Sequence, residues 1–185
     1  DPDLLQARID LAGVYLHLGR FPEAKVLLIE VIDVCSRNSA DPSKIGLAAK
    51  VSMGRLEGAR GDKSAGEDWF VDALADLDQL EQTDFVLKQN IQYELAISKA
   101  RQQRTQEAVG LLREVLRDRE STLGMDHPST LSTVGTLGAV LANSGDLSSA
   151  EPCFQRVYEG QLRTLGAEHP STLSTLTNLG NMQVE

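Results

Sequence analysis

The fold is decided by a stretch that the chain contains twice: Thr122-Leu-Gly-Met-Asp-His-Pro-Ser-Thr-Leu-Ser-Thr133 returns as Thr164-Leu-Gly-Ala-Glu-His-Pro-Ser-Thr-Leu-Ser-Thr175. The copies differ only where Ala167 replaces Met125 and Glu168 replaces Asp126. They begin 42 residues apart, and duplication at such a spacing is typical of proteins built from stacked structural repeats. The same period should therefore run through the rest of the chain.

The repeated unit is clearest near the N-terminus, where helical patterns of apolar residues lie on both sides of Gly19. Pro22 opens the second pattern, where its missing N–H costs nothing. Steps of 42 residues fall on large apolar residues in the later units: from Leu11 on Met53, Leu95, Leu137 and Leu179, and from Leu28 on Phe70, Leu112 and Phe154. The sequence therefore predicts helical hairpins, with helices near 3–18, 22–36, 42–60, 63–80, 84–102, 105–122, 128–144, 148–165 and 170–184.

The composition suits helices packed on helices. Of the 185 residues 41% are hydrophobic but only 4% are aromatic, so small and aliphatic side chains must fill the interior. The formal net charge of −9 argues against binding to nucleic-acid phosphates or to anionic membranes. We therefore expect neither nucleic acid nor membrane among the partners.

The location expected from the sequence is the cytoplasm. No apolar run approaches the roughly 20 residues that span a bilayer, and no charged and then apolar leader opens the chain. Cys35 and Cys153 lie far apart within helical patterns, which favours two small buried hydrophobes over a disulfide framework.

The pattern resembles the tetratricopeptide repeat (TPR), as in Leu137-Gly138, Gly145-Asp146-Leu147, Ala150 and Phe154. The 42-residue period exceeds the usual 34. Together with Leu-Gly-x-x-His-Pro-x-Thr-Leu at 123–131 and 165–173, it is similar to the subgroup found in kinesin light chains. The resemblance implies an all-α, right-handed superhelical solenoid of antiparallel hairpins. It would form a single array over 1–185, with repeats near 1–40, 41–82, 83–124 and 125–166 and a partial fifth repeat, one helix only, at 167–185.

The middle repeats depart from the pattern. Glu57 and Gly66 replace the Tyr and Ala of the first unit, while Lys99 and Gln103 replace a large apolar residue and the turn Gly. Because Gly in a helix interior costs roughly 0.5–1 kcal/mol relative to Ala, looser packing is expected there.

No catalytic, metal or cofactor site is predicted, and the chain is not expected to be an enzyme. His127 and His169 are duplicated, but each lacks a Cys or second His at ligand spacing, and each precedes a Pro at a helix start. A role in the turn is therefore the preferred interpretation. A nucleophile with a base held against it and a Gly-rich phosphate loop are both missing.

A run of acidic residues has two interpretations. Between residues 62 and 84 the only base is Lys63, and the eight acids are Asp62, Glu67, Asp68, Asp72, Asp76, Asp78, Glu81 and Asp84. A solvated outer face of the second repeat is favoured, and a docking patch for a basic partner is the alternative.

The resemblance implies that the first helix of each hairpin lines a concave groove that binds a protein or peptide partner. Two arginines in this lining suggest a partner with acidic or carboxylate groups, with Asn and Tyr side chains adding hydrogen bonds and stacking. The residues predicted for the site are Arg55, Asn90, Tyr93, Arg101, Asn143 and Asn178. The function predicted is that of a scaffold or adaptor.

Two other functions remain open from the sequence. The array could act as a sensor that changes its superhelical pitch on binding a peptide or small ligand, with Gly58, Gly61 and Gly66 as flexible points. It could also self-associate, because the helix predicted at 170–184 would leave an apolar face uncovered.

Overall fold

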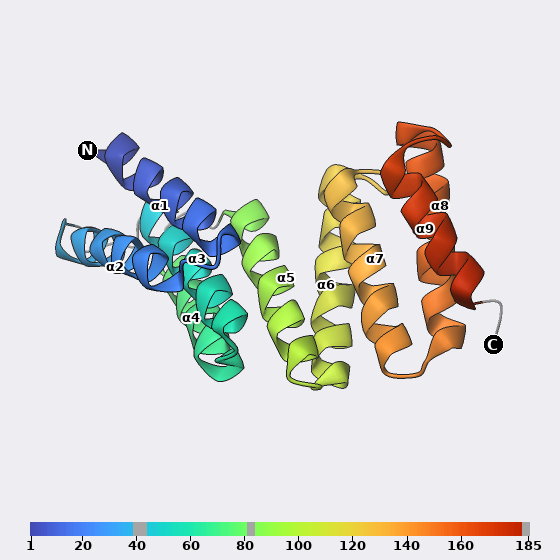
Figure 1. Cartoon of the computed structure of the whole chain (residues 1–185), viewed down its shortest axis with the longest axis horizontal. Helices are drawn as coiled ribbons and strands as arrows, with labels where there is room; N and C mark the ends of the chain where they lie inside the picture. The colour runs from blue at the N-terminus through green and yellow to red at the C-terminus, as the bar shows by residue number, and fades with distance from the viewer. Residues whose placement is uncertain (39–43, 81–83, 183–185) are drawn as a thin grey trace. The chain divides into compact units, whose positions relative to one another are not determined.

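The computed structural model of the protein describes residues 1–38, 44–80 and 84–182 (Figure 1). These described residues form nine α-helices and no strand, so the prediction of an all-α repeat is confirmed. The helices are α1 (Pro2–His17), α2 (Phe21–Asn38), α3 (Lys44–Arg60), α4 (Lys63–Leu77), α5 (Phe85–Arg101), α6 (Thr105–Leu123), α7 (Pro128–Asn143), α8 (Leu147–Leu165) and α9 (Pro170–Met182). The predicted ends agree within a few residues. The predicted start at 42 and the predicted end at 184 lie outside the described residues.

The chain divides into two compact units, Asp1–Gln102 and Gln103–Glu185. In the first unit each of the helices α1 to α4 contacts the helix that follows it, and the first helices α1, α3 and α5 also contact one another in order. In the second unit α6, α7, α8 and α9 contact their sequence neighbours in the same way. The division falls between α5 and α6, inside the predicted repeat 83–124.

The His-Pro pairs begin helices, as predicted. Pro128 is the first residue of α7, and Nδ1 of His127 accepts a hydrogen bond from the Ser129 backbone N–H at 3.1 Å. His169 does the same for Ser171 at the start of α9, also at 3.1 Å. A side chain that accepts from a free N–H is what a helix N-terminus requires. The duplicated histidines are therefore capping residues.

The Leu-Gly part of the duplicated stretch is explained by backbone conformation. Gly124 has φ 93° and ψ 165°, and Gly166 has φ 87° and ψ 168°. This region is essentially restricted to glycine, because a Cβ would clash there. Each glycine ends one helix and turns the chain toward the histidine cap of the next.

The turn between α5 and α6 contains a strained residue. Gln103 has φ 63°, whereas the equivalent turns use Gly19, Gly61 and Gly145 at φ 71°, 96° and 87°. A non-glycine residue in this left-handed region costs about 1–2 kcal/mol.

We expect Gln103→Gly to raise the free energy of unfolding by about 1 kcal/mol, since glycine relieves this strain at some cost in unfolded-chain entropy. Urea unfolding followed by circular dichroism measures the change. Gly145→Ala should lower the free energy of unfolding. A lower free energy of unfolding in Gln103→Gly would contradict the claim that the backbone of Gln103 is strained.

The expectation of looser packing in the second repeat is wrong at its glycines. A Cβ on Gly66 would lie 2.8 Å from the Gly54 carbonyl oxygen and 3.1 Å from the Gly58 nitrogen. A Cβ on Gly54 would lie 2.6 Å from Cε1 of Phe70. The glycines therefore allow α3 and α4 to approach more closely than alanines would.

The charged residues that break the apolar pattern form ion pairs between successive hairpins. Glu57 of α3 is buried and lies 2.7 Å from Lys25 Nζ of α2. One period later the signs are reversed, because Lys99 of α5 lies 2.8 Å from Glu67 of α4. These residues thus replace an apolar contact by a charged one at the same place in the repeat.

A buried polar contact recurs in the second unit. Arg119 of α6 is buried, and its Nη1 donates to Oγ1 of Thr133 at 2.7 Å and to the Ser129 carbonyl at 3.1 Å. One period later Oγ1 of Thr175 lies 2.8 Å from Oε1 of Gln161. The second threonine of the duplicated stretch therefore joins each second helix to the first helix that follows.

Candidate functional site

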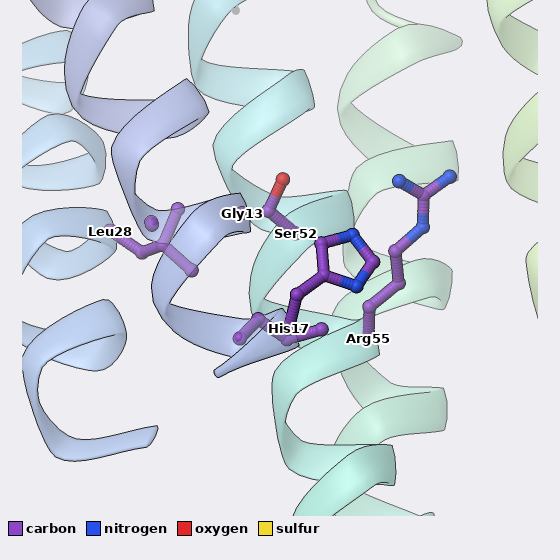
Figure 2. Close-up of a pocket in the computed structure, with 7 residues that line it drawn as sticks. Gly13, His17, Leu28, Ser52 and Arg55 are labelled. Atoms are coloured by element: carbon purple, nitrogen blue, oxygen red, sulfur yellow. The ribbon is translucent and has the colours of Figure 1, made fainter. Parts of the chain in front are cut away.

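A pocket of about 290 Å³ lies between α1 and α3 in the first unit (Figure 2). Its floor is apolar, and its polar groups come from three side chains. In Figure 2 His17 and Arg55 extend from α1 and α3 beside this space, with Ser52 one turn before Arg55. The lining residues are Ala12, Gly13, Leu16, His17, Leu28, Ser52 and Arg55.

A second pocket of about 220 Å³ adjoins the first, because Leu16 and Arg55 line both. It extends the hollow from α3 to α5 and reaches the start of α4. Its lining residues are Leu16, Gly54, Arg55, Gly58, Ala59, Lys63, Phe70, Glu94, Ile97, Ser98 and Arg101. We call the two pockets together the first-helix groove, since α1, α3 and α5 provide most of the lining.

Arg55 is held by an ion pair inside the groove. Its Nε and Nη2 donate to the same oxygen, Oε1 of Glu94, at 2.9 and 2.6 Å. The Arg55 side chain is 52% exposed, whereas that of Glu94 is only 17% exposed. The partly buried carboxylate therefore fixes the guanidinium over the junction of the two pockets and neutralises part of its charge.

Arg101 and Lys63 form the positive end of the groove. Arg101 is exposed, and its Nη1 would lie 3.7 Å from a Cβ on Gly58. The Nζ of Lys63, in the first turn of α4, donates to the Arg101 carbonyl at 2.7 Å. Three cations and one carboxylate therefore line the second pocket, in a chain whose net charge is −9.

The six predicted site residues fall into three groups. Arg55 and Arg101 line the same pocket. Asn90 and Tyr93 of α5 line neither of the two pockets, and Asn90 is exposed while Tyr93 is half-buried. Asn143, the last residue of α7, and Asn178 of α9 are exposed and belong to the second unit. Of the six, Arg55 and Arg101 are therefore the two that line the described groove.

Sequence reasoning missed two contributions to the groove. Lys63 was not predicted because it begins a second helix, and the prediction considered only first helices. The pair Arg55–Glu94 was not predicted because the two residues are not equivalent in the repeat. The position 42 residues after Arg55 is Ile97, and Glu94 lies about one helical turn before it. Opposite charges on facing turns of successive first helices were the available signal.

Most of the acidic run between residues 62 and 84 is used within the first unit. Asp62 caps α4, and lysines of α3 and α5 pair with five of the other acids. The pairs are Glu67–Lys99, Asp72–Lys50, Asp76–Lys50, Asp78–Lys88 and Asp84–Lys44. Asp68 is exposed, and Glu81 lies outside the described residues. The face is therefore largely a set of ion pairs that join neighbouring helices.

Three of these ion pairs shift the pKa values of two residues, Lys50 and Asp84. Burial alone would lower the pKa of Lys50, but hydrogen bonds to Asp72 and Asp76 outweigh it and raise the pKa above its ordinary value. The hydrogen bond from Lys44, with that from the Leu87 backbone, lowers the pKa of Asp84. Both shifts favour the charged forms that make the pairs.

Two features are absent from the described part of the chain. None of its helices has the length and apolar character needed to cross a membrane. No group of three or more His, Cys, Asp or Glu side chains there is arranged to hold a metal ion.

The comparisons with known proteins point to one family. The tetratricopeptide repeat family matches residues 88–162 and 134–185, and a second tetratricopeptide repeat model matches residues 4–38. No curated protein sequence matches the chain significantly. A solved structure of a putative kinesin light chain with nearly identical TPR-like repeats, from Podosopora anserina, is 26% identical. Its TM-score is 0.82 over 98% of this chain and 86% of that chain.

A second solved structure, BtubC (BKLC) from P. vanneervenii, is 18% identical and supports the fold alone. Its TM-score is 0.84 over 98% of this chain and 72% of that chain. The family matches cover more than half of the sequence and agree with the hairpins described above. The chain therefore belongs to the tetratricopeptide repeat family, and its repeats are kinesin light chain-like.

Proposed function

We propose that the first-helix groove binds an acidic or carboxylate-bearing segment of a partner protein, and that the chain acts as a scaffold without catalysis. The observation that carries the proposal is the concentration of positive charge in the second pocket. Arg55, Lys63 and Arg101 line it with Glu94 as the one opposing charge. The net charge of −9 would by itself repel an anionic ligand, so this local excess of cations favours the pocket as the place where such a ligand binds.

The two ends of the groove suit different parts of a peptide. The pocket between α1 and α3 has an apolar floor of Ala12, Leu16 and Leu28, which suits an uncharged side chain. The guanidinium of Arg101 offers paired N–H donors that match a carboxylate. A segment lying across the first helices would therefore place its acidic residue toward α5.

Glu94 competes with any ligand for Arg55. Nε and Nη2 of Arg55 both donate to Glu94, so a carboxylate ligand must share or displace this contact. Arg101 faces no such competitor within the groove lining. We therefore expect Arg101 to contribute more to binding than Arg55 in the native protein.

The test begins with peptides selected from a random displayed library on the wild-type chain. The enriched peptides should contain Asp, Glu or a free C-terminal carboxylate. Arg55→Glu/Arg101→Glu should weaken their binding by at least about tenfold, since two attractive charges become repulsive. Glu94→Gln should strengthen it several-fold because it frees Arg55. Fluorescence anisotropy of labelled peptides measures both changes.

Arg113→Glu/Arg117→Glu, on the exposed surface of α6, is the matched control with the same change in net charge. It should leave peptide binding unchanged, and circular dichroism should show equal helicity for all variants. Enrichment of peptides without acidic groups, or equal binding by the Arg55→Glu/Arg101→Glu variant, would refute the proposal.

A further inference from the structure

Helix α1 is apolar on two opposite faces. One face packs into the first unit, where Ile9 and Ala12 are buried. The other face is open to solvent: Leu4, Leu11 and Val14, together with Leu18 directly after the helix, are 54%, 42%, 52% and 65% exposed. A helix that is apolar on both sides is normally covered on both sides. The exposed face therefore has the character of an interior surface.

The repeat itself shows how this face is treated elsewhere. The positions equivalent to Leu11 and Val14 in later first helices lie one, two and three periods further on. All of them are buried: Met53, Leu95 and Leu137 for Leu11, and Leu56, Ser98 and Val140 for Val14. In those hairpins a neighbouring second helix lies against the first helix, as α2 does against α3 and α6 against α7. On α1 the same positions, Leu11 and Val14, are exposed to solvent.

The spacing of the exposed residues indicates what kind of helix fits. With Ala7, which is also exposed, the residues follow one another at alternating intervals of three and four. We call this set, Leu4, Ala7, Leu11, Val14 and Leu18, the α1 seam. Alternating intervals of three and four are the pattern by which two helices interlock as knobs and holes, and a seam of this kind can pair with a copy of itself.

The charges beside the α1 seam favour a parallel pair. Asp3 and Asp10 lie along one flank and Arg8 along the other. In a parallel pair opposite flanks face each other, so Asp3 of one copy approaches Arg8 of the other, whereas an antiparallel pair would bring the two Asp10 side chains together. Arg8 also pairs with Glu30 of its own chain, at 2.9 Å, with both side chains partly exposed.

We propose that the α1 seam binds the α1 seam of a second copy of this chain, in parallel and about a two-fold axis. The contact is two heptads long, so the dimer is weak and depends on protein concentration. The α1 residues of the first-helix groove, Ala12, Gly13, Leu16 and His17, lie outside the seam. The dimer therefore presents two open grooves. Through avidity it binds a partner that carries two groove-binding segments more tightly than a partner that carries one.

Sedimentation equilibrium of the 185-residue chain, from micromolar to near-millimolar concentration, tests the dimer. The wild type should shift from monomer to dimer, and Leu11→Asp/Val14→Asp should raise the dissociation constant by more than about tenfold. Leu173→Asp/Leu176→Asp on α9 is the control. Those residues are also exposed, at 50% and 47%, and they form the rival surface for self-association.

A wild type that stays monomeric over this range would overturn the proposal. So would a dimer that the α9 variant abolishes and the α1 variant leaves intact. Thermal unfolding must show that both variants keep the wild-type fold. Because Leu11 and Val14 are already exposed, their replacement by Asp should change the unfolding temperature little.

Disulfide cross-linking tests the orientation. In a chain with Cys35→Ala and Cys153→Ala, Leu4→Cys should form a cross-linked dimer on oxidation, because equivalent residues meet in a parallel pair. In an antiparallel pair the two Leu4→Cys sites would lie roughly 20 Å apart and could not join. Cross-linking only between Leu4→Cys and Leu18→Cys chains would overturn the parallel arrangement.

Discussion

Replacing Arg119 with alanine is expected to lower the free energy of unfolding by about 3 kcal/mol. Arg119 is 4% exposed, and its guanidinium donates to Thr133 and to the Ser129 carbonyl. Alanine would remove these charge-assisted hydrogen bonds and leave a cavity between α6 and α7. Urea unfolding followed by circular dichroism measures the loss.

Arg119→Gln separates the hydrogen bond from the charge. A glutamine already makes the equivalent contact one period later, because Oε1 of Gln161 accepts a hydrogen bond from the hydroxyl of Thr175. We therefore expect Arg119→Gln to keep at least half of the stability that Arg119→Ala loses. If the two variants were equally unstable, the charge or the longer side chain would be the source of the stability, and the equivalence between the repeats would be refuted.

The helical repeat was predictable from the sequence because its signals are local. Apolar spacing and proline positions act within one helix or turn, and the 42-residue period made the pattern visible. The His-Pro pairs were assigned to helix starts from the position of their prolines, Pro128 and Pro170, and the Ser129–His127 contact agrees. Helix ends were less certain, since α4 ends at Leu77 rather than near residue 80.

Contacts between hairpins were not predictable in the same way. Glu57 and Lys99 looked like defects in an apolar pattern, yet each finds an opposite charge on the preceding second helix. Gly66 looked like a source of looseness because its cost was judged from helix propensity alone. Propensity describes an isolated helix, whereas these residues are determined by the helix on the other side of the contact.

The candidate site was predictable in part. The positions of Arg55 and Arg101 came from the resemblance to the tetratricopeptide repeat, and both line the second pocket. The role of Glu94 depends on a side-chain direction that the period does not specify. Lys63 belongs to α4, a second helix, whereas the prediction considered first helices. Asn90, Tyr93, Asn143 and Asn178 stay predictions as groove residues.

Gly66→Ala is expected to lower the free energy of unfolding by about 2 kcal/mol, even though alanine is the better helix former. The added Cβ would meet backbone atoms at 2.8 and 3.1 Å, the carbonyl of Gly54 and the nitrogen of Gly58. Backbone atoms cannot rotate away as the end of a side chain can, so α3 and α4 must move apart. That movement would loosen the packing around Phe70, which is buried between them.

Gly110→Ala provides the matched control for this prediction. Gly110 lies inside α6, is exposed, and has nothing within 4 Å of its added Cβ. Alanine there should stabilise the chain by roughly 0.5–1 kcal/mol through helix propensity. The same substitution should thus have opposite signs at two helical glycines. If Gly66→Ala were neutral or stabilising in urea unfolding, the close approach of α3 and α4 would not be a requirement of the fold, and the glycines of the second repeat would again be a sign of loose packing.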